Sequence, residues 1–196
     1  MPAMSPILAV IGQNGSGKDE VVKYLNCCYG IPLLSTGDMV RQIAAQKGIE
    51  PTRPNLQQIS EEYFREKGRG CFVRLMVEQI KKNGWPTAGI TGIRSPEDVK
   101  ILKDAFGKDF FLFSVYVTDP KVRFQRMTKR AEERDPASYE QFLANDRREE
   151  EIFHISQAAR LADVFLNNDG TLEDLHRRIE DVLAQKKLLP TGNSKR

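Results

Sequence analysis

The sequence lacks any long hydrophobic run, and it contains few cysteines. Only three of its 196 residues are cysteines, and they do not have the spacing of a metal site. A helix needs about 20 consecutive apolar residues to span a bilayer, and the apolar run 7–11 is too short even for the core of a signal peptide. We therefore expect no membrane contact, and the odd number of cysteines favours a reducing, cytoplasmic setting.

A strong excess of charge of one sign is also missing. The chain has 30 basic and 27 acidic side chains, so its formal net charge is +3. This balance does not predict a nucleic-acid partner, and the sequence has no aromatic platform on which bases could stack. The 40% of hydrophobic residues is enough for a sizeable core, and the length fits one domain. The oligomeric state stays open between a monomer and a small homo-oligomer.

Short apolar runs alternate along the chain with longer helical patterns. This alternation is typical of βαβ units, so we predict a three-layer α/β fold in which a parallel five-stranded sheet lies between helices. The expected strands are 7–11, 32–34, 88–91, 110–117 and 164–166. The expected helices that follow them are 18–28, 37–47, 96–106, 121–133 and 172–185.

Two segments interrupt this alternation. Residues 53–83 have the pattern of two helices inserted between the second and third strands, and residues 136–160 have that of two more between the fourth and fifth. Inserts at these places stand over the carboxyl edge of the sheet, where open α/β sheets bind ligands. We expect a single domain over 1–189 and a disordered tail over 190–196.

A glycine-rich loop directly follows the first expected strand and directly precedes a helix. Its residues are Gly12-Gln13-Asn14-Gly15-Ser16-Gly17-Lys18, which match the pattern G-x-x-x-x-G-K. Small residues let successive backbone N–H groups turn inward around an anion, and the helix adds its N-terminal donors and dipole. Lys18 then reaches the β and γ phosphates. The loop predicts a nucleotide-phosphate site and P-loop phosphotransferase chemistry.

Asp19 stands where such loops usually carry a Ser or Thr hydroxyl that binds Mg²⁺. A carboxylate is also a hard oxygen ligand, so we expect Asp19 to bind the metal directly or through water. The alternative is that Asp19 only satisfies the first donors of the helix. Some small-molecule kinases, among them phage deoxynucleoside monophosphate kinases, carry a similar S-G-K-D ending.

A second motif, Ser35-Thr36-Gly37-Asp38-Met39-Val40-Arg41, follows the second expected strand. Ser35 and Asp38 have the spacing of a capping box, which leaves Arg41 unexplained. The run closely resembles the S-T-G-D-M-x-R segment of adenylate kinases, which opens their monophosphate-binding region. By this resemblance Thr36 and Arg41 bind the phosphate and base edge of an acceptor nucleotide, and Asp38 belongs to the same acceptor-binding segment.

A third motif, Thr91-Gly92-Ile93-Arg94, follows the third expected strand. It is similar to the D-G-x-R run of nucleoside monophosphate kinases, which implies that Arg94 binds the acceptor phosphate. The acid of that run is replaced by Thr91. We hypothesise that the metal-binding carboxylate has moved from this strand to Asp19.

Four arginines share one stripe of the helix that follows the fourth expected strand, since they are spaced by three, four and four residues. They are Arg123, Arg126, Arg130 and Arg134. One interpretation is a solvated helix face. The other is a set of lid arginines that clamp the transferring phosphoryl group, with Arg126 and Arg130 as catalytic residues, Arg123 and Arg134 as further lid residues, and Arg147 as a weaker candidate.

The segment 162–171 resembles the A-D-x-x-I-x-N-x-G-(S/T)-L run of dephospho-CoA kinases, whose loop lies against adenine. Asn168 and Gly170 are the matching residues, although Asn-Asp-Gly-Thr is also a plain turn with a helix cap. The run Val117-Thr118-Asp119-Pro120 is similar to the one before the lid of the same kinases.

Together these resemblances imply a P-loop kinase fold of the nucleoside monophosphate kinase type, with an acceptor-binding insert at about 37–83 and a lid at about 123–150. The implied partners are ATP, as phosphoryl donor with Mg²⁺, and a small phosphorylated acceptor. That acceptor is a nucleoside or deoxynucleoside monophosphate, or alternatively dephospho-CoA. A nucleotide-dependent switch or accessory NTPase without an acceptor is the alternative from another class, and Arg41 and Arg94 speak against it.

Overall fold

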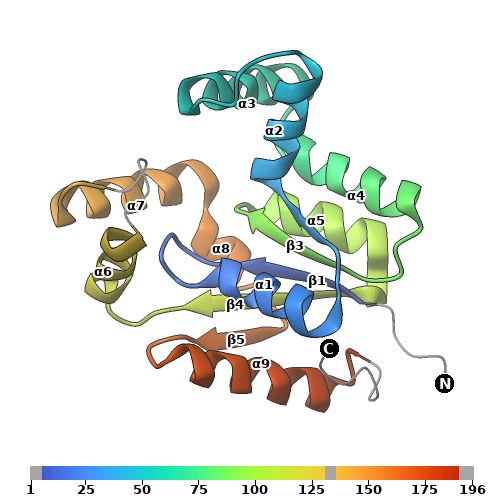
Figure 1. The fold of residues 1–196 in the computed structure, drawn as a ribbon, viewed down its shortest axis with the longest axis vertical. Coiled ribbons are helices and arrows are strands. Elements are labelled where there is room, and N and C mark those ends of the chain that lie inside the picture. The colour runs from blue at the N-terminus through green and yellow to red at the C-terminus, as the bar shows by residue number, and fades with distance from the viewer. Residues whose placement is uncertain (1–5, 131–135, 190–196) are drawn as a thin grey trace.

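A computed structural model describes residues 6–130 and 136–189 of the chain. Its centre is a sheet of five parallel strands in the order β2-β3-β1-β4-β5. The strands are β1 (Ile7–Ile11), β2 (Leu33–Ser35), β3 (Ala88–Ile93), β4 (Phe110–Tyr116) and β5 (Val164–Asn167). This sheet with helices on both faces confirms the predicted three-layer α/β fold (Figure 1).

Helices cover both faces of the sheet and form two inserts. They are α1 (Lys18–Tyr29), α2 (Thr36–Gln46), α3 (Arg53–Lys67), α4 (Cys71–Asn83), α5 (Pro96–Phe106), α6 (Pro120–Arg130), α7 (Tyr139–Phe153), α8 (Ile155–Ala159) and α9 (Leu172–Lys186). A short 3₁₀ turn, Gly107–Asp109, joins α5 to β4. The two expected pairs of insert helices are α3 with α4 and α7 with α8, and α6 and α7 stand beyond the carboxyl ends of the strands (Figure 1).

The central strand β1 divides the core into two clusters because its successive side chains point to opposite faces. Leu8 and Val10 pack with α1 and α9 on one face. Ile7 and Ala9 pack with α4, α5 and α8 on the other. All five residues of β1 are buried, as expected for a parallel sheet covered on both faces.

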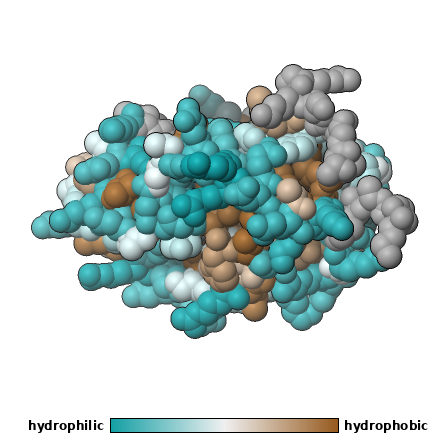
Figure 2. All heavy atoms as spheres, turned by 90° about the horizontal axis from the view of Figure 1, so that it is seen from below, coloured by the Kyte–Doolittle hydropathy of each residue, from teal (hydrophilic) through white to brown (hydrophobic). Residues whose placement is uncertain are grey.

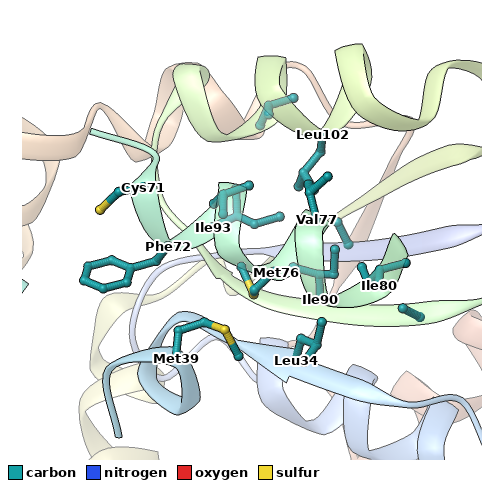
Figure 3. Packing of buried hydrophobic residues seen from close by; sticks show 14 of the residues in the cluster. Leu34, Met39, Cys71, Phe72, Met76, Val77, Ile80, Ile90, Ile93 and Leu102 are labelled. Carbon is teal, nitrogen blue, oxygen red and sulfur yellow. The ribbon is translucent and has the colours of Figure 1, made fainter. Parts of the chain in front are cut away.

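The larger cluster anchors α4 to the sheet (Figure 3). Met76, Val77 and Ile80 of α4 lie with Ile90 of β3 and Leu102 of α5. Burial of each such side chain contributes about 1.5–3 kcal/mol. This packing holds the insert formed by α3 and α4 against β3, which ends at Ile93.

Short polar residues fix where several helices begin. The Ser95 hydroxyl accepts a hydrogen bond from the Asp98 amide, and the Asp98 carboxylate accepts one from the Ser95 amide, so α5 starts with a complete capping box. The Ser35 hydroxyl likewise accepts from the Asp38 amide at the start of α2. These caps set the direction of each helix as it leaves the carboxyl edge of the sheet.

The observed strands, and the helices that follow them, begin and end within two residues of the expected positions, with one exception. The helix expected over 121–133 is described to Arg130, and its last residues, together with Arg134, lie outside the described part of the chain. The expected tail over 190–196 also lies outside it.

The face that carries β5 and α9 is mostly hydrophilic, with hydrophobic groups gathered near its middle (Figure 2). Exposed hydrophobic side chains on and beside β5 include Phe165, Tyr116 and Leu161. Within 6–130 and 136–189, no helix is long and apolar enough to cross a membrane.

Candidate phosphoryl-transfer site

The glycine-rich loop links the central strand β1 to helix α1 at the carboxyl edge of the sheet. The Ser16 amide donates to the Gln13 carbonyl at 3.1 Å, which closes the turn. Gly15 (φ 76°) and Gly17 (φ 93°) both lie in the left-handed region, where a residue with a Cβ is strained. The sequence therefore folds locally into the turn that a P-loop requires, and α1 begins at Lys18.

Two glycines of this loop are also needed for close packing. A Cβ on Gly12 would lie 2.5 Å from both the Ser16 hydroxyl and the Val115 carbonyl. A Cβ on Gly17 would lie 2.3 Å from the Asn168 side-chain nitrogen. The loop is thus fitted between β4 and the segment that follows β5.

The Ser16 hydroxyl is buried inside the loop and finds no hydrogen-bond partner among the described residues. A buried polar group without a partner is costly. An anionic oxygen held by the loop is the kind of group that would satisfy it, so this feature fits a phosphate site.

Asp19 lies directly against Thr91, the residue that replaces the expected acid of the third strand. The Thr91 hydroxyl donates to Asp19 Oδ1 at 3.0 Å. The end of β3 and the first turn of α1 thus bring together one carboxylate and one hydroxyl, both hard oxygen ligands of the kind that suits Mg²⁺.

This oxygen pair fits a metal that is held mainly by the nucleotide. The described residues contain no cluster of three or more His, Cys, Asp and Glu side chains that could hold an ion alone. Mg²⁺ is usually bound by one or two carboxylates, substrate phosphates and water. Asp19, with Thr91 beside it, is the group that would hold it here, and the ion would neutralise charge on the phosphates.

The acceptor-side motifs meet at the ends of β2 and β3. The Thr36 hydroxyl donates to the Gly92 carbonyl at 3.3 Å. Gly92 has φ 84°, and a Cβ there would lie 2.3 Å from the Thr36 hydroxyl, so both strands end in close contact. Asp38 accepts from the Ser35 hydroxyl at 2.6 Å and pairs with Arg41 at 3.4 Å. The Arg41 side chain is about half exposed.

Arg94 leaves the end of β3 toward α7. Its guanidinium lies 3.5 Å from the Glu149 carboxylate and 5.3 Å from the centroid of the Phe153 ring. The structure therefore brings the Arg94 side chain to the second insert.

Arg123 has a structural position that the sequence did not reveal. Its side chain is only 3% exposed, donates to the Asn14 carbonyl at 3.0 Å and pairs with Asp146 of α7 at 2.5 Å. Its guanidinium also lies 4.9 Å from the centre of the Phe142 ring. The solvated-face interpretation is wrong for Arg123, because the helix face that carries it packs on α7 and the P-loop.

Arg126 lies one turn further along α6 and points to the loop after β5. Its Nη2 donates to the carbonyls of Asn168 at 2.8 Å and Gly170 at 3.4 Å. Its Nη1 is buried and has no partner among the residues described. The side chain of Arg130 and the whole of Arg134 lie outside what the structure describes, so their lid roles stay predictions. Arg147 of α7 has no hydrogen bond or ion pair among those described here.

The loop after β5 braces the P-loop. The Asn168 side chain is 7% exposed and donates to the Ser16 carbonyl at 2.8 Å. Asp169 accepts from Asn167 and from both the amide and hydroxyl of Thr118. These hydrogen bonds, that from Asn167 foremost, lower the pKa of Asp169 to about 2. The Asn168 amide is turned toward the P-loop backbone by its hydrogen bond to the Ser16 carbonyl. Gly170 lies close to the start of α9, because a Cβ on Gly170 would lie 2.7 Å from the Asp174 carboxylate.

A cavity of about 420 Å³ opens beside the first residues of the P-loop. Gly12 and Gln13 line one side, and Tyr116, Phe165 and Arg160 line another. It lies on the α8 face of the sheet, opposite the α1 face.

Three residues at this edge were not predicted from the sequence as site residues: Thr91 as the partner of Asp19, Asp146 as the partner of Arg123, and Arg69, whose side chain reaches α7. The long sequence separations explain why. Periodicity and motif spacing reveal which residues share a face, but not which distant segment that face meets.

The fold and the P-loop define a P-loop protein of the kinase-like class. A family model described as AAA domain matches residues 11–142. The UPF0200 protein of Thermococcus onnurineus is 33% identical and covers 90% of this chain and 96% of its own length. The UPF0200 protein of Pyrococcus horikoshii is 33% identical over 91% of this chain and 96% of that protein. The chain therefore belongs to the AAA-domain family and to the UPF0200 family.

Two solved structures with a similar fold are named as kinases. Shikimate kinase from Acinetobacter baumannii in complex with shikimate matches with a TM-score of 0.61 and 16% identity, covering 94% of this chain and 96% of that one. A gluconokinase from Sinorhizobium meliloti matches with a TM-score of 0.61 and 14% identity, covering 94% of each chain. At these identities the likeness shows the fold, and it confirms the predicted P-loop kinase fold.

Proposed function

We propose that the protein is an ATP-dependent kinase that transfers the γ-phosphoryl group to a nucleoside or deoxynucleoside monophosphate. The observation that supports this proposal is that the P-loop and the two motifs that resemble acceptor-binding segments follow three neighbouring strands at one edge of the sheet. The P-loop follows β1, while Thr36 and Arg41 follow β2 and Arg94 follows β3. The Thr36 hydroxyl contacts the Gly92 carbonyl, so the acceptor motifs adjoin each other beside the P-loop strand.

Within this proposal each group has one task. Lys18 and the loop amides bind the phosphates of ATP, and Asp19 holds Mg²⁺. Arg41 and Arg94 bind the acceptor phosphate. Arg126 and Arg130 stabilise the charge of the transferring phosphoryl group, since phosphoryl transfer depends mainly on positioning and electrostatics. Arg123 supports the P-loop through the Asn14 carbonyl.

Dephospho-CoA is the second candidate acceptor. The Thr118 amide and hydroxyl donate to the Asp169 carboxylate at 2.8 and 2.7 Å. These bonds join the two segments, 117–120 and 162–171, that resemble dephospho-CoA kinases. The motif from Thr36 to Arg41 favours the monophosphate.

A panel of acceptors tests the proposal directly. The protein is incubated with ATP and Mg²⁺ alone, with each of the common ribo- and deoxyribonucleoside monophosphates, and with dephospho-CoA, and ADP release is followed. We expect one monophosphate to raise ADP release well above background and to appear as its diphosphate. A response to dephospho-CoA alone would support the second candidate. Background hydrolysis that no acceptor changes would contradict both and favour the nucleotide-dependent switch.

A further inference from the structure

Arg69 occupies a loop of three residues that is fixed in place from both sides. It lies between α3 and α4, flanked by Gly68 (φ 75°) and Gly70 (φ 74°), both left-handed. A Cβ on Gly70 would lie 2.3 Å from Ile101 of α5, so the loop is pressed against that helix. Arg74 donates to the carbonyls of Lys67 and Arg69 at 2.9 Å each. The backbone that presents Arg69 is therefore built for one conformation.

The Arg69 side chain crosses from the first insert to the second. Its Nη1 donates to the Ile152 carbonyl at the end of α7 at 2.5 Å. Its guanidinium lies 6.0 Å from the centroid of the Phe153 ring, and the guanidinium of Arg94 lies 5.3 Å from the same centroid. The loop between α3 and α4 and the end of β3 thus send two cations to one aromatic ring.

One carboxylate among the described residues pairs with these two guanidinium groups, so their positive charge is only partly neutralised. Glu149 is the carboxylate beside Arg94, at 3.5 Å. Arg69 has no carboxylate partner within the described ranges 6–130 and 136–189. Both guanidinium groups lie within 6.0 Å of the centroid of the Phe153 ring, and each offers a planar fork of donors that matches the oxygens of a phosphate dianion.

We infer that Arg69 joins Arg94 in binding the phosphate monoester of the acceptor, at the place where α7 meets the α3–α4 loop. This inference rests on the proposed kinase function. Glu149 acts in the opposite direction, because its carboxylate competes with the incoming phosphate for Arg94. The bond from Arg69 to the Ile152 carbonyl holds the two inserts near each other until the phosphate takes that donor.

A binding titration tests this role without requiring turnover. The protein is saturated with ADP and Mg²⁺ to fill the P-loop, and inorganic phosphate, AMP and dephospho-CoA are titrated by calorimetry. Arg69→Gln should weaken the binding of inorganic phosphate and of AMP about tenfold. Arg69→Lys keeps the positive charge but loses the planar fork of donors, so its affinity for inorganic phosphate and AMP should lie between those of the wild type and Arg69→Gln. Glu149→Gln should bind inorganic phosphate more tightly than the wild type.

Arg65→Gln is the matched control, since Arg65 is an exposed arginine in the last turn of α3. It should leave all affinities unchanged. A lower melting temperature of Arg69→Gln with unchanged affinities would show that Arg69 only ties the inserts together and would overturn the inference. Failure of the ADP-loaded wild type to bind phosphate or AMP would overturn it as well.

The titration and the acceptor panel separate the two proposals. Phosphate binding that depends on Arg69, combined with no transfer to any acceptor, contradicts the kinase function and leaves the anion site. Turnover with an acceptor whose affinity is the same in Arg69→Gln contradicts the role of Arg69 and leaves the kinase function.

Discussion

The Thr91 hydroxyl donates a 3.0 Å hydrogen bond to the Asp19 carboxylate, so a hydroxyl at the end of β3 faces a carboxylate at the start of α1. P-loop proteins usually hold Mg²⁺ with the reverse assignment, a hydroxyl after the lysine and an acid on a strand. The same two chemical groups are present here on exchanged elements. The direct contact between the two positions supports the hypothesis that the metal-binding carboxylate has moved from the third strand to Asp19.

An exchange of the two residues is the sharpest test of this pair. Asp19→Asn should lower the Mg²⁺-dependent part of ADP affinity by roughly 10–100-fold, and Asp19→Thr alone should not restore it. The double variant Asp19→Thr/Thr91→Asp should recover most of the Mg²⁺-dependent ADP affinity, because it again offers one carboxylate and one hydroxyl. The measurement is ADP affinity with Mg²⁺ and with EDTA. Full Mg²⁺ dependence in Asp19→Asn would rule out the carboxylate as the metal ligand.

Lys18 should contribute far more to kcat/KM than Lys23, another lysine of α1. Lys18→Ala is expected to lower kcat/KM with the acceptor found in the panel by about 100-fold or more, because a preorganised cation next to the transferring phosphoryl group is lost. Lys23→Ala removes an exposed lysine that pairs with Glu20 of the same helix and should change kcat/KM by less than about twofold. Equal losses in the two variants would contradict a phosphate-binding role for Lys18.

The ion pair between Arg123 and Asp146 should contribute to stability and to nucleotide affinity together. Asp146→Ala leaves the Arg123 charge buried without its carboxylate, which costs about 3–5 kcal/mol of unfolding free energy. ADP affinity should fall as well, because Arg123 also holds the Asn14 carbonyl of the P-loop. Chemical denaturation and ADP titration measure the two effects.

The exposed pair of Lys100 and Asp104 on α5 is the control for that experiment. Asp104→Ala should change the unfolding free energy by less than about 1 kcal/mol and leave ADP affinity unchanged. A loss in Asp146→Ala no greater than in the control would show that the buried pair does not brace the loop.

Asp169 should give the protein an acid-dependent contribution to stability. Hydrogen bonds from Asn167 and Thr118 lower the pKa of Asp169 to about 2, below its ordinary value of 3.8. Since the folded pKa is the lower one, the contribution is fully present above about pH 4 and is lost as the pH falls through about 2. Asp169→Asn should therefore be less stable than the wild type at pH 6, and the difference should shrink toward pH 2.

Urea denaturation at several pH values measures this difference. Glu78→Gln, which changes an exposed carboxylate of α4, is the control and should show no comparable trend. A stability difference between Asp169→Asn and the wild type that stays constant from pH 6 to pH 2 would contradict the prediction.

The sequence was a good guide to local structure and to the start of the site. The strand 7–11, the start of α1 at Lys18 and the capping box at Ser95 follow from hydrophobic pattern, glycine placement and cap chemistry, all of which act over a few residues. The class of fold follows from the alternation of strands and helices.

Contacts between distant segments could not be predicted in the same way. The Asn168 amide was expected to frame a base, but it hydrogen-bonds to the Ser16 carbonyl, which is distant in sequence. Arg123 belongs to the predicted arginine stripe, yet its burial depends on how α6 packs against α7. Arg69 carried no motif, and only the left-handed glycines on either side of it mark its loop as special.

The central position of β1 has a consequence for how the chain folds during synthesis. Ile7 pairs with Ala88 of β3 and with Phe110 of β4, so β1 has no hydrogen-bonding neighbour until β3 has been synthesised, and it has its second neighbour only after β4. Such non-local pairing slows folding and leaves early segments exposed. The P-loop therefore reaches its final place only after β3 and β4 have joined β1, and nucleotide capture by a nascent chain would report that these strands have paired.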